Sequence, residues 1–233
     1  MVFLTEDRGK KRGVAKNATK SRRRFGAALE PMTRGRVAYV EREHRELVRL
    51  DRIEPSATPL GAVSGRSNGD AAQALGHAGY FAELLDEWAP DGSPNGRLYR
   101  LGVAVGEALG RAESVDALAR YFEYWLLRLE GVYPGLDQCP RCRTRALGEG
   151  AVLLMGERTY VCDDCAHGGL RLSPDAVAFL RVACRQTPSQ VASAGTPVPA
   201  LREIERVHDR LIAVHLEKEL RSARVVRELR PEL

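Results

Sequence analysis

The sequence predicts an α+β protein with an N-terminal sheet and a helical remainder. Over residues 1–54, apolar residues recur too closely for an amphipathic helix, and glycine and basic residues bound each run. From residue 70 onward the apolar spacing becomes three to four, which is typical of helices packed on a core. We therefore expect a sheet domain over 1–54, a linker over 55–69 and a helical domain over 70–233, interrupted by two cysteine pairs in a zinc-ribbon-like insertion over 139–165.

Four short strands are expected in the first domain, over 2–5, 12–16, 36–41 and 45–53. Proline and glycine then mark the linker, at Pro55, Pro59, Gly61, Gly65 and Gly69. Helices are expected over 72–88, 98–109, 115–129, 174–184 and about 200–229, with a proline-rich stretch over 187–199. In the last two helices, Cys184 is interpreted as a small buried residue, and His208 and His215 as surface or boundary residues.

The cysteine pairs Cys139–Cys142 and Cys162–Cys165 are separated by 19 residues. Two thiolates that are two positions apart can turn back on one ion, and two such pairs complete the tetrahedral shell of structural zinc. The segments 152–154 and 159–161 read as a hairpin that brings the second pair beside the first. We expect one structural zinc with no open ligand position; paired redox thiols and coincidence are the alternatives.

Basic residues are concentrated near the N-terminus. Nine of them lie between residues 8 and 24 without an acidic residue, namely Arg8, Lys10, Lys11, Arg12, Lys16, Lys20, Arg22, Arg23 and Arg24. Removing these nine from the 36 basic residues of the chain leaves 27, against 31 acidic residues. Because such a concentration repels itself without an anionic partner, it predicts nucleic-acid binding by these nine residues. The alternative is a disordered basic leader.

Several function classes are disfavoured. Gly9-Lys10 lacks the glycine spacing and the Ser or Thr of a phosphate-binding loop, and no Gly-x-Ser-x-Gly elbow occurs. His44-Arg45-Glu46 matches the His-x-Glu motif of zinc deaminases. Those enzymes bind zinc through one histidine and two cysteines and leave a position for water, whereas here the two cysteine pairs together would fill all four positions. No run of about 18 apolar residues and no signal-peptide core is present. We expect a cytoplasmic, nucleoid-associated protein that is not an enzyme.

Four segments, in order along the chain, resemble the RecO family. They are KNATKSRRRFGAALEP (16–31), YFAELLDEW (80–88), YFEYWLLRLEGVYPGLDQCPRC (121–142) and HLEKELRSARVVREL (215–229). The cysteine pairs alone are shared by many zinc ribbons. Their position after a Leu-Leu helix and a Pro-x-Leu sequence is what narrows the choice to this family.

The resemblance implies an OB-fold barrel at the N-terminus, a helical domain and often a four-cysteine zinc element. It also implies binding of single- and double-stranded DNA, strand annealing, and RecA loading with RecR and single-strand DNA-binding protein. Phe3, Phe25 and Tyr39 are the aromatic residues near the basic run, and each is interpreted as core. Since an OB-fold has five strands and only four are expected here, the family's first strand is expected upstream of Met1.

Two other functions remain open on the sequence. The same charges suit a basic zinc-binding protein of RNA or ribosome assembly, which would bind structured RNA. They also suit a protein adaptor whose basic run engages an acidic tail. Competition between single-stranded DNA and structured RNA for the protein separates the RNA-associated function from that of RecO. Binding to a partner protein that persists at high salt without nucleic acid favours the adaptor.

Overall fold

The computed structural model describes residues 1–16, 25–42, 45–143 and 147–230. The chain forms two compact units, and these are described separately. The first unit holds Met1–Arg111 together with Leu220–Leu233, and the second holds Ala112–Glu219. The C-terminal segment thus belongs to the same unit as the N-terminal sheet, whereas the sequence grouped it with the other helices.

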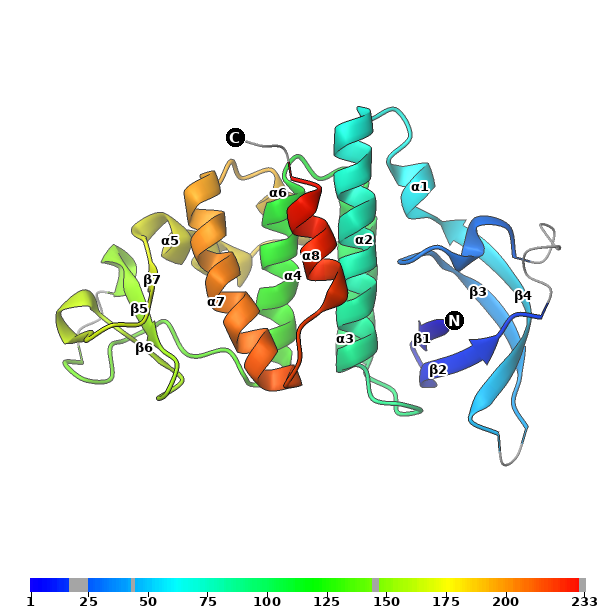
Figure 1. Cartoon of the computed structure of the whole chain (residues 1–233), viewed down its shortest axis with the longest axis horizontal. Helices are drawn as coiled ribbons and strands as arrows, with labels where there is room; N and C mark the ends of the chain where they lie inside the picture. The colour runs from blue at the N-terminus through cyan, green and yellow to red at the C-terminus, as the bar shows by residue number, and fades with distance from the viewer. Residues whose placement is uncertain (17–24, 43–44, 144–146, 231–233) are drawn as a thin grey trace. The chain divides into compact units, whose positions relative to one another are not determined.

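The first unit contains a four-stranded sheet, whose strands can be followed in Figure 1. Its strands are β1 (Val2–Thr5), β2 (Gly9–Val14), β3 (Arg34–Val40) and β4 (Leu47–Ala57). Their order is β1-β2-β4-β3, with a parallel pair β2–β4 between two antiparallel pairs. The four expected strands are confirmed, although β2 begins three residues earlier than predicted and β4 runs four residues further, into the expected linker.

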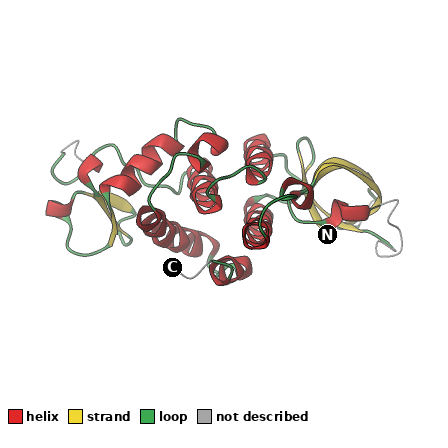
Figure 2. Ribbon diagram, turned by 90° about the horizontal axis from the view of Figure 1, so that it is seen from above, coloured by secondary structure: helices red, strands yellow, loops and turns green. Residues whose placement is uncertain are grey.

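The sheet is strongly curved, as Figure 2 shows. Its inner face buries Val48, Leu50 and Ile53 of β4 against Phe25, which is only 1% exposed. The outermost strands also approach each other, because the rings of Phe3 in β1 and Tyr39 in β3 lie 5.4 Å apart. Among the described residues β1 and β3 share no strand pairing, so the structure is not a closed barrel.

Helices complete the first unit: η2 (Gly26–Leu29), α1 (Pro59–Ala62), α2 (Asn68–Trp88), α3 (Gly96–Leu109) and α8 (Arg221–Glu228). Helix α1 lies within the expected linker, and Thr58 caps it by accepting a hydrogen bond from the backbone N–H of Gly61. Helices α2 and α3 begin earlier than predicted because side-chain oxygens of the residues before them accept backbone hydrogen bonds at their N-termini.

The second unit contains four helices among its described residues: α4 (Val115–Leu129), α5 (Pro174–Ala183), α6 (Pro188–Ala192) and α7 (Val198–Leu216). Helix α4 has the predicted bounds. Helix α6 lies within the proline-rich stretch over 187–199, and a reciprocal Thr187–Gln190 capping box starts it. None of the described helices of either unit is long and apolar enough to cross a membrane.

The cysteine-bearing part of the second unit is a small antiparallel sheet. It consists of β5 (Ala151–Leu154), β6 (Thr159–Val161) and β7 (Leu170–Leu172), in the order β6-β5-β7, with short turns η3 (Leu147–Glu149) and η4 (Asp163–Cys165). The predicted hairpin of β5 and β6 is confirmed. Strand β7 was not predicted, since three residues after two glycines carry little periodic signal.

The single long helix predicted over 200–229 is wrong. It is divided into α7 and α8 by Glu217, whose φ of 55° lies in the left-handed region. The new helix is then held by Glu83 of α2, whose carboxylate accepts hydrogen bonds from the backbone N–H groups of Arg221 and Ser222. The chain therefore ends α7 at this point and begins a second helix, whose first backbone N–H groups are satisfied by Glu83.

Candidate metal centre and nucleic-acid interface

The four predicted cysteines converge on one point. Cys139 and Cys142 lie in the segment after α4, and Cys162 and Cys165 follow β6. Their four sulfur atoms all lie within 4.8 Å of one another, and the Sγ atoms of Cys142 and Cys162 are 3.5 Å apart. A tetrahedral zinc with Zn–S bonds of about 2.3 Å separates its sulfurs by about 3.8 Å. The donor set and its geometry therefore fit a four-thiolate metal site.

The electrostatics of this cluster favour one thiolate. Burial raises the pKa of Cys139, but hydrogen bonds from the backbone of Cys142, Cys162 and Arg141 outweigh burial and lower the pKa to about 6. Hydrogen bonding to Cys162 raises the pKa of Cys165 to about 12. The pKa of Cys162 is raised as well, so the Cys139 sulfur bears negative charge while Cys162 and Cys165 retain protons, which a bound cation would replace.

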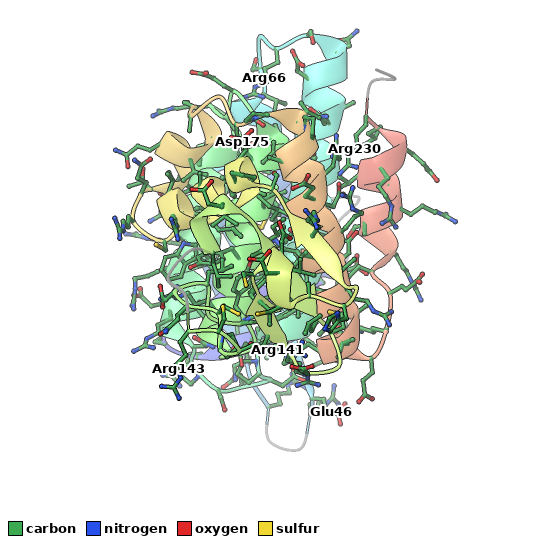
Figure 3. All side chains as sticks on the ribbon, turned by 90° about the vertical axis from the view of Figure 1, so that its left-hand side faces the viewer. Glu46, Arg66, Arg141, Arg143, Asp175 and Arg230 are labelled. Atoms are coloured by element: carbon green, nitrogen blue, oxygen red, sulfur yellow. The ribbon has the colours of Figure 1, made fainter. Side chains whose placement is uncertain are left out.

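Arg141 connects the two cysteine pairs, a role that sequence reasoning missed. Its guanidinium donates to the backbone carbonyl of Cys165 and to Oε1 of Glu157, each at 2.7 Å. Figure 3 labels Arg141 and Arg143 on the cysteine-bearing element. Arg143 adopts a φ of 59°, and its N–H donates to the carbonyl of Cys139 at 2.8 Å. The turn is therefore made without the glycine that often follows such a pair.

Two other predictions for single residues need correction. His208 is not a surface residue: it is 0% exposed and contacts Glu123 at 2.9 Å. Cys184 is not buried, since it is half-exposed at the end of α5 and donates from its thiol to the carbonyl of Arg181. The helical turn instead buries its neighbour Ala183.

The described basic residues of the N-terminal run differ in their surroundings. Lys10 is 7% exposed, donates to the carbonyl of Asp86 at 2.6 Å and forms ion pairs with Asp86 and Asp91. Arg12 pairs with the same two carboxylates, at 3.5 and 3.7 Å. These two residues connect β2 to α2 and the loop after it. Lys10 therefore has a structural role that its place in a basic run did not reveal.

The other members of the run lie at the surface or outside the described residues. Lys11 pairs with Glu41 at 2.6 Å, and this hydrogen bond lowers the pKa of Glu41. Arg8 and Lys16 are exposed. Lys20, Arg22, Arg23 and Arg24 lie outside the described residues.

A basic hollow lies at one end of the sheet, with a volume of about 410 Å³. Its basic lining residues are Lys16, Arg42, Arg45 and Arg49. Four apolar side chains also line it, of which Val14, Val40 and Leu47 are 42, 46 and 51% exposed and Val48 is buried, and Glu46 contributes one acidic side chain. Cations beside exposed apolar groups are the combination that binds a single nucleic-acid strand, through phosphates and base faces.

Sequence reasoning missed Arg42, Arg45 and Arg49. They alternate with Glu41 and Glu46, so no run of like charge marks them. A signal was nevertheless present, because Arg45, Leu47 and Arg49 have the two-residue spacing of one strand face. The aromatic residues were interpreted correctly in the case of Phe25, which is core.

Comparison with known proteins agrees with the resemblance seen in the sequence. Residues 2–59 match the family Recombination protein O N terminal, and residues 70–224 match Recombination protein O C terminal. These matches define a recombination protein that has both of the family's domains. The chain belongs to the RecO family.

Relatives named DNA repair protein RecO match nearly the whole chain. The protein of Koribacter versatilis is 34% identical over 221 residues, which cover 94% of this chain and 87% of the relative. That of Anaeromyxobacter sp. strain K is 36% identical over 237 residues, covering 100% and 91%. The Geobacter sulfurreducens protein is 35% identical over 231 residues, covering 99% and 91%.

Proposed function

We propose that this chain is a DNA-binding mediator of recombination that performs no chemical step of its own. It holds single- and double-stranded DNA, anneals complementary strands, and helps to load RecA together with RecR and single-strand DNA-binding protein. The observation that carries the proposal is the basic hollow at the end of the sheet, in a chain of the RecO family.

The hollow supplies both kinds of contact that a single strand needs. Lys16, Arg45 and Arg49 pair with phosphates, and release of the counterions bound there drives association. The exposed side chains of Val40 and Leu47 offer apolar surface to the bases without reading their edges. We leave Lys10 out of the DNA-binding set because its ammonium group is buried in ion pairs.

We propose that the sheet belongs to the OB class of five-stranded Greek-key barrels. Three observations support this assignment: the parallel β2–β4 pair, the antiparallel pairs on both sides of it, and the close approach of the outer strands at Phe3 and Tyr39. A fifth strand pairing with both β1 and β3 would close the barrel and cover the outer edges of these two strands.

For the cysteine cluster we propose one structural zinc per chain, held by Cys139, Cys142, Cys162 and Cys165. Bound zinc would supply a cross-link between the two cysteine-bearing segments, with all four ligand positions filled by thiolates. The short sheet β6-β5-β7 is too small to fold on its own hydrophobic contacts, so the metal would contribute directly to its folding.

The DNA proposal is tested by measuring single-strand affinity against salt concentration. If the four cations of the hollow each neutralise one phosphate, log affinity should fall against log salt with a slope of about −3, at about −0.7 per contact. The combined change Lys16→Ala, Arg45→Ala, Arg49→Ala should flatten the slope by about 2. Binding should weaken by similar factors for all sequences, because phosphate contacts carry no base information.

A matched control removes three exposed arginines of the second unit, Arg185, Arg206 and Arg210. This variant should keep the wild-type slope. A second test variant, Arg22→Ala with Arg23→Ala and Arg24→Ala, should flatten the slope by a similar amount if the basic run joins the same site. Loss of binding in the control alone would move the DNA site to the second unit.

Two alternative partners are separated by the same titration. Tighter binding to structured RNA than to single-stranded DNA would favour an RNA-associated protein. Partner binding that survives high salt without nucleic acid would favour a protein adaptor. Either result would replace the proposal.

A further inference from the structure

Four hydrogen-bonded polar side chains lie one after another inside the second unit; three of them are buried and Tyr133 is partly exposed. The hydroxyl of Tyr160 in β6 donates to the hydroxyl of Tyr133 at 3.3 Å, and the same oxygen of Tyr133 lies 3.3 Å from Nε2 of His208 in α7. Nδ1 of His208 lies 2.9 Å from Oε2 of Glu123 in α4. Tyr160, His208 and Glu123 are each 0% exposed, so these groups depend on one another for hydrogen bonds.

The direction of every bond in this chain follows from Glu123. Its carboxylate already accepts from Arg120 at 2.5 Å, and a carboxylate can only accept, so Nδ1 of His208 carries the hydrogen. The opposite nitrogen then accepts from Tyr133, whose oxygen accepts from Tyr160. Only a neutral His208 allows this order, and burial lowers the pKa of His208, which favours the neutral form.

The two tyrosines hold the bases of the two cysteine-bearing segments. Tyr133 lies six residues before Cys139, and Tyr160 lies two residues before Cys162. Their rings are 6.2 Å apart, and the ring of Tyr133 packs edge-on against His208 at 5.4 Å. Each segment therefore passes through this contact before it reaches the sulfur cluster.

We propose that Tyr160, Tyr133, His208 and Glu123 form a clasp that is energetically coupled to metal binding at the four cysteines. The clasp aligns the two cysteine-bearing segments, so less conformational entropy remains to be lost when a metal joins them. By thermodynamic reciprocity, the metal strengthens the clasp by the same factor. The state of the cysteine cluster is thus transmitted to α4 and α7. This inference rests on the proposed metal site.

The test measures zinc affinity by competition with a chromophoric chelator. Tyr133→Phe and Tyr160→Phe each remove one hydroxyl of the clasp and keep the ring, so we expect each to weaken zinc binding about tenfold. Tyr124→Phe is the matched control. Its ring packs on Tyr133 at 4.8 Å, but its hydroxyl accepts from Arg128 outside the clasp. Its zinc affinity should stay within about twofold of wild type.

Hydrogen exchange gives a readout that does not depend on the chelator. Removing zinc from the wild-type protein should speed amide exchange in the part of α7 around His208. With zinc bound, Tyr133→Phe should show the same faster exchange and Tyr124→Phe should not. Circular dichroism checks that each variant folds. If Tyr133→Phe does not fold, Tyr160→Phe is used for the test instead.

The two proposals fail in different ways. If the wild-type protein binds no zinc, the metal site is wrong and the coupling falls with it. If zinc binds the wild type but both clasp variants bind it as tightly as Tyr124→Phe, the clasp is overturned and the metal site stands. Amide hydrogen exchange in α7 that is the same with and without zinc would also overturn the clasp.

Discussion

Replacing Glu123 by glutamine removes one negative charge from the interior of the second unit without changing the size of the side chain. The hydrogen bonds can be remade, because the new amide can donate to Nδ1 of His208 and the tyrosine chain can reverse its direction. The charge cannot be replaced. Arg120, which is 2% exposed, would keep its ion pair with Glu205 at 3.3 Å but lose the stronger negative charge beside it.

Breaking a buried ion pair by neutralising one partner costs about 3–5 kcal/mol, because the other charge stays buried. Since Glu205 compensates part of this, we expect Glu123→Gln to lower the free energy of unfolding of the second unit by about 3 kcal/mol. For a unit of this size, that loss lowers the Tm by roughly 10–20 °C.

Urea unfolding followed by Trp125 fluorescence measures this loss. Its indole N–H donates to the carbonyl of Ala183 at 3.1 Å, so its emission reports the packing of α4 on α5. A Trp88→Phe background removes the signal of the first unit. Glu157→Gln is the control, because its pair with Arg141 is exposed and worth at most about 1 kcal/mol. Equal midpoints for Glu123→Gln and Glu157→Gln would refute the electrostatic reasoning.

Three further predictions concern the metal, Lys10 and pH. Purified protein should contain one zinc per chain, and Cys162→Ser with Cys165→Ser should abolish it; metal analysis that finds zinc retained would reject the site. Lys10→Met should destabilise the first unit by about 1–3 kcal/mol in thermal unfolding, yet leave single-strand DNA affinity within about twofold; a larger affinity loss would return Lys10 to the DNA site. Burial lowers the pKa of His208, so near and below pH 6.5 the unfolded chain binds a proton at this residue more readily than the folded chain does. The free energy of unfolding should therefore fall as pH drops below about 6.5. His208→Gln should make that fall shallower, and identical slopes would contradict it.

Local patterns predicted a large part of the fold. Helix α4 has the predicted bounds because its apolar side chains recur at spacings of three and four and Ser114 caps its start. The four cysteines were found from spacing alone, and the structure brings them together. In both cases the signal lies within a few residues of the feature that it predicts.

Features that depend on distant partners could not be predicted. His208 flanks the apolar side of its helix, and its buried partner Glu123 lies 85 residues earlier in the chain. Lys10 looks like its basic neighbours until Asp86 folds beside it. The break at Glu217 carries no glycine or proline to mark it. It depends on the contact between Glu83 and the start of the next helix.

Strand annealing tests the central claim most directly. Two complementary oligonucleotides, one of them fluorescent, are mixed with the zinc-loaded protein, and duplex formation is timed against the spontaneous rate. The account predicts that the wild-type protein accelerates annealing without any nucleotide cofactor. The Lys16→Ala, Arg45→Ala, Arg49→Ala variant should lose most of this acceleration, whereas Arg185→Ala, Arg206→Ala, Arg210→Ala should retain it. No acceleration by the wild-type protein, or equal acceleration by both variants, would contradict the account.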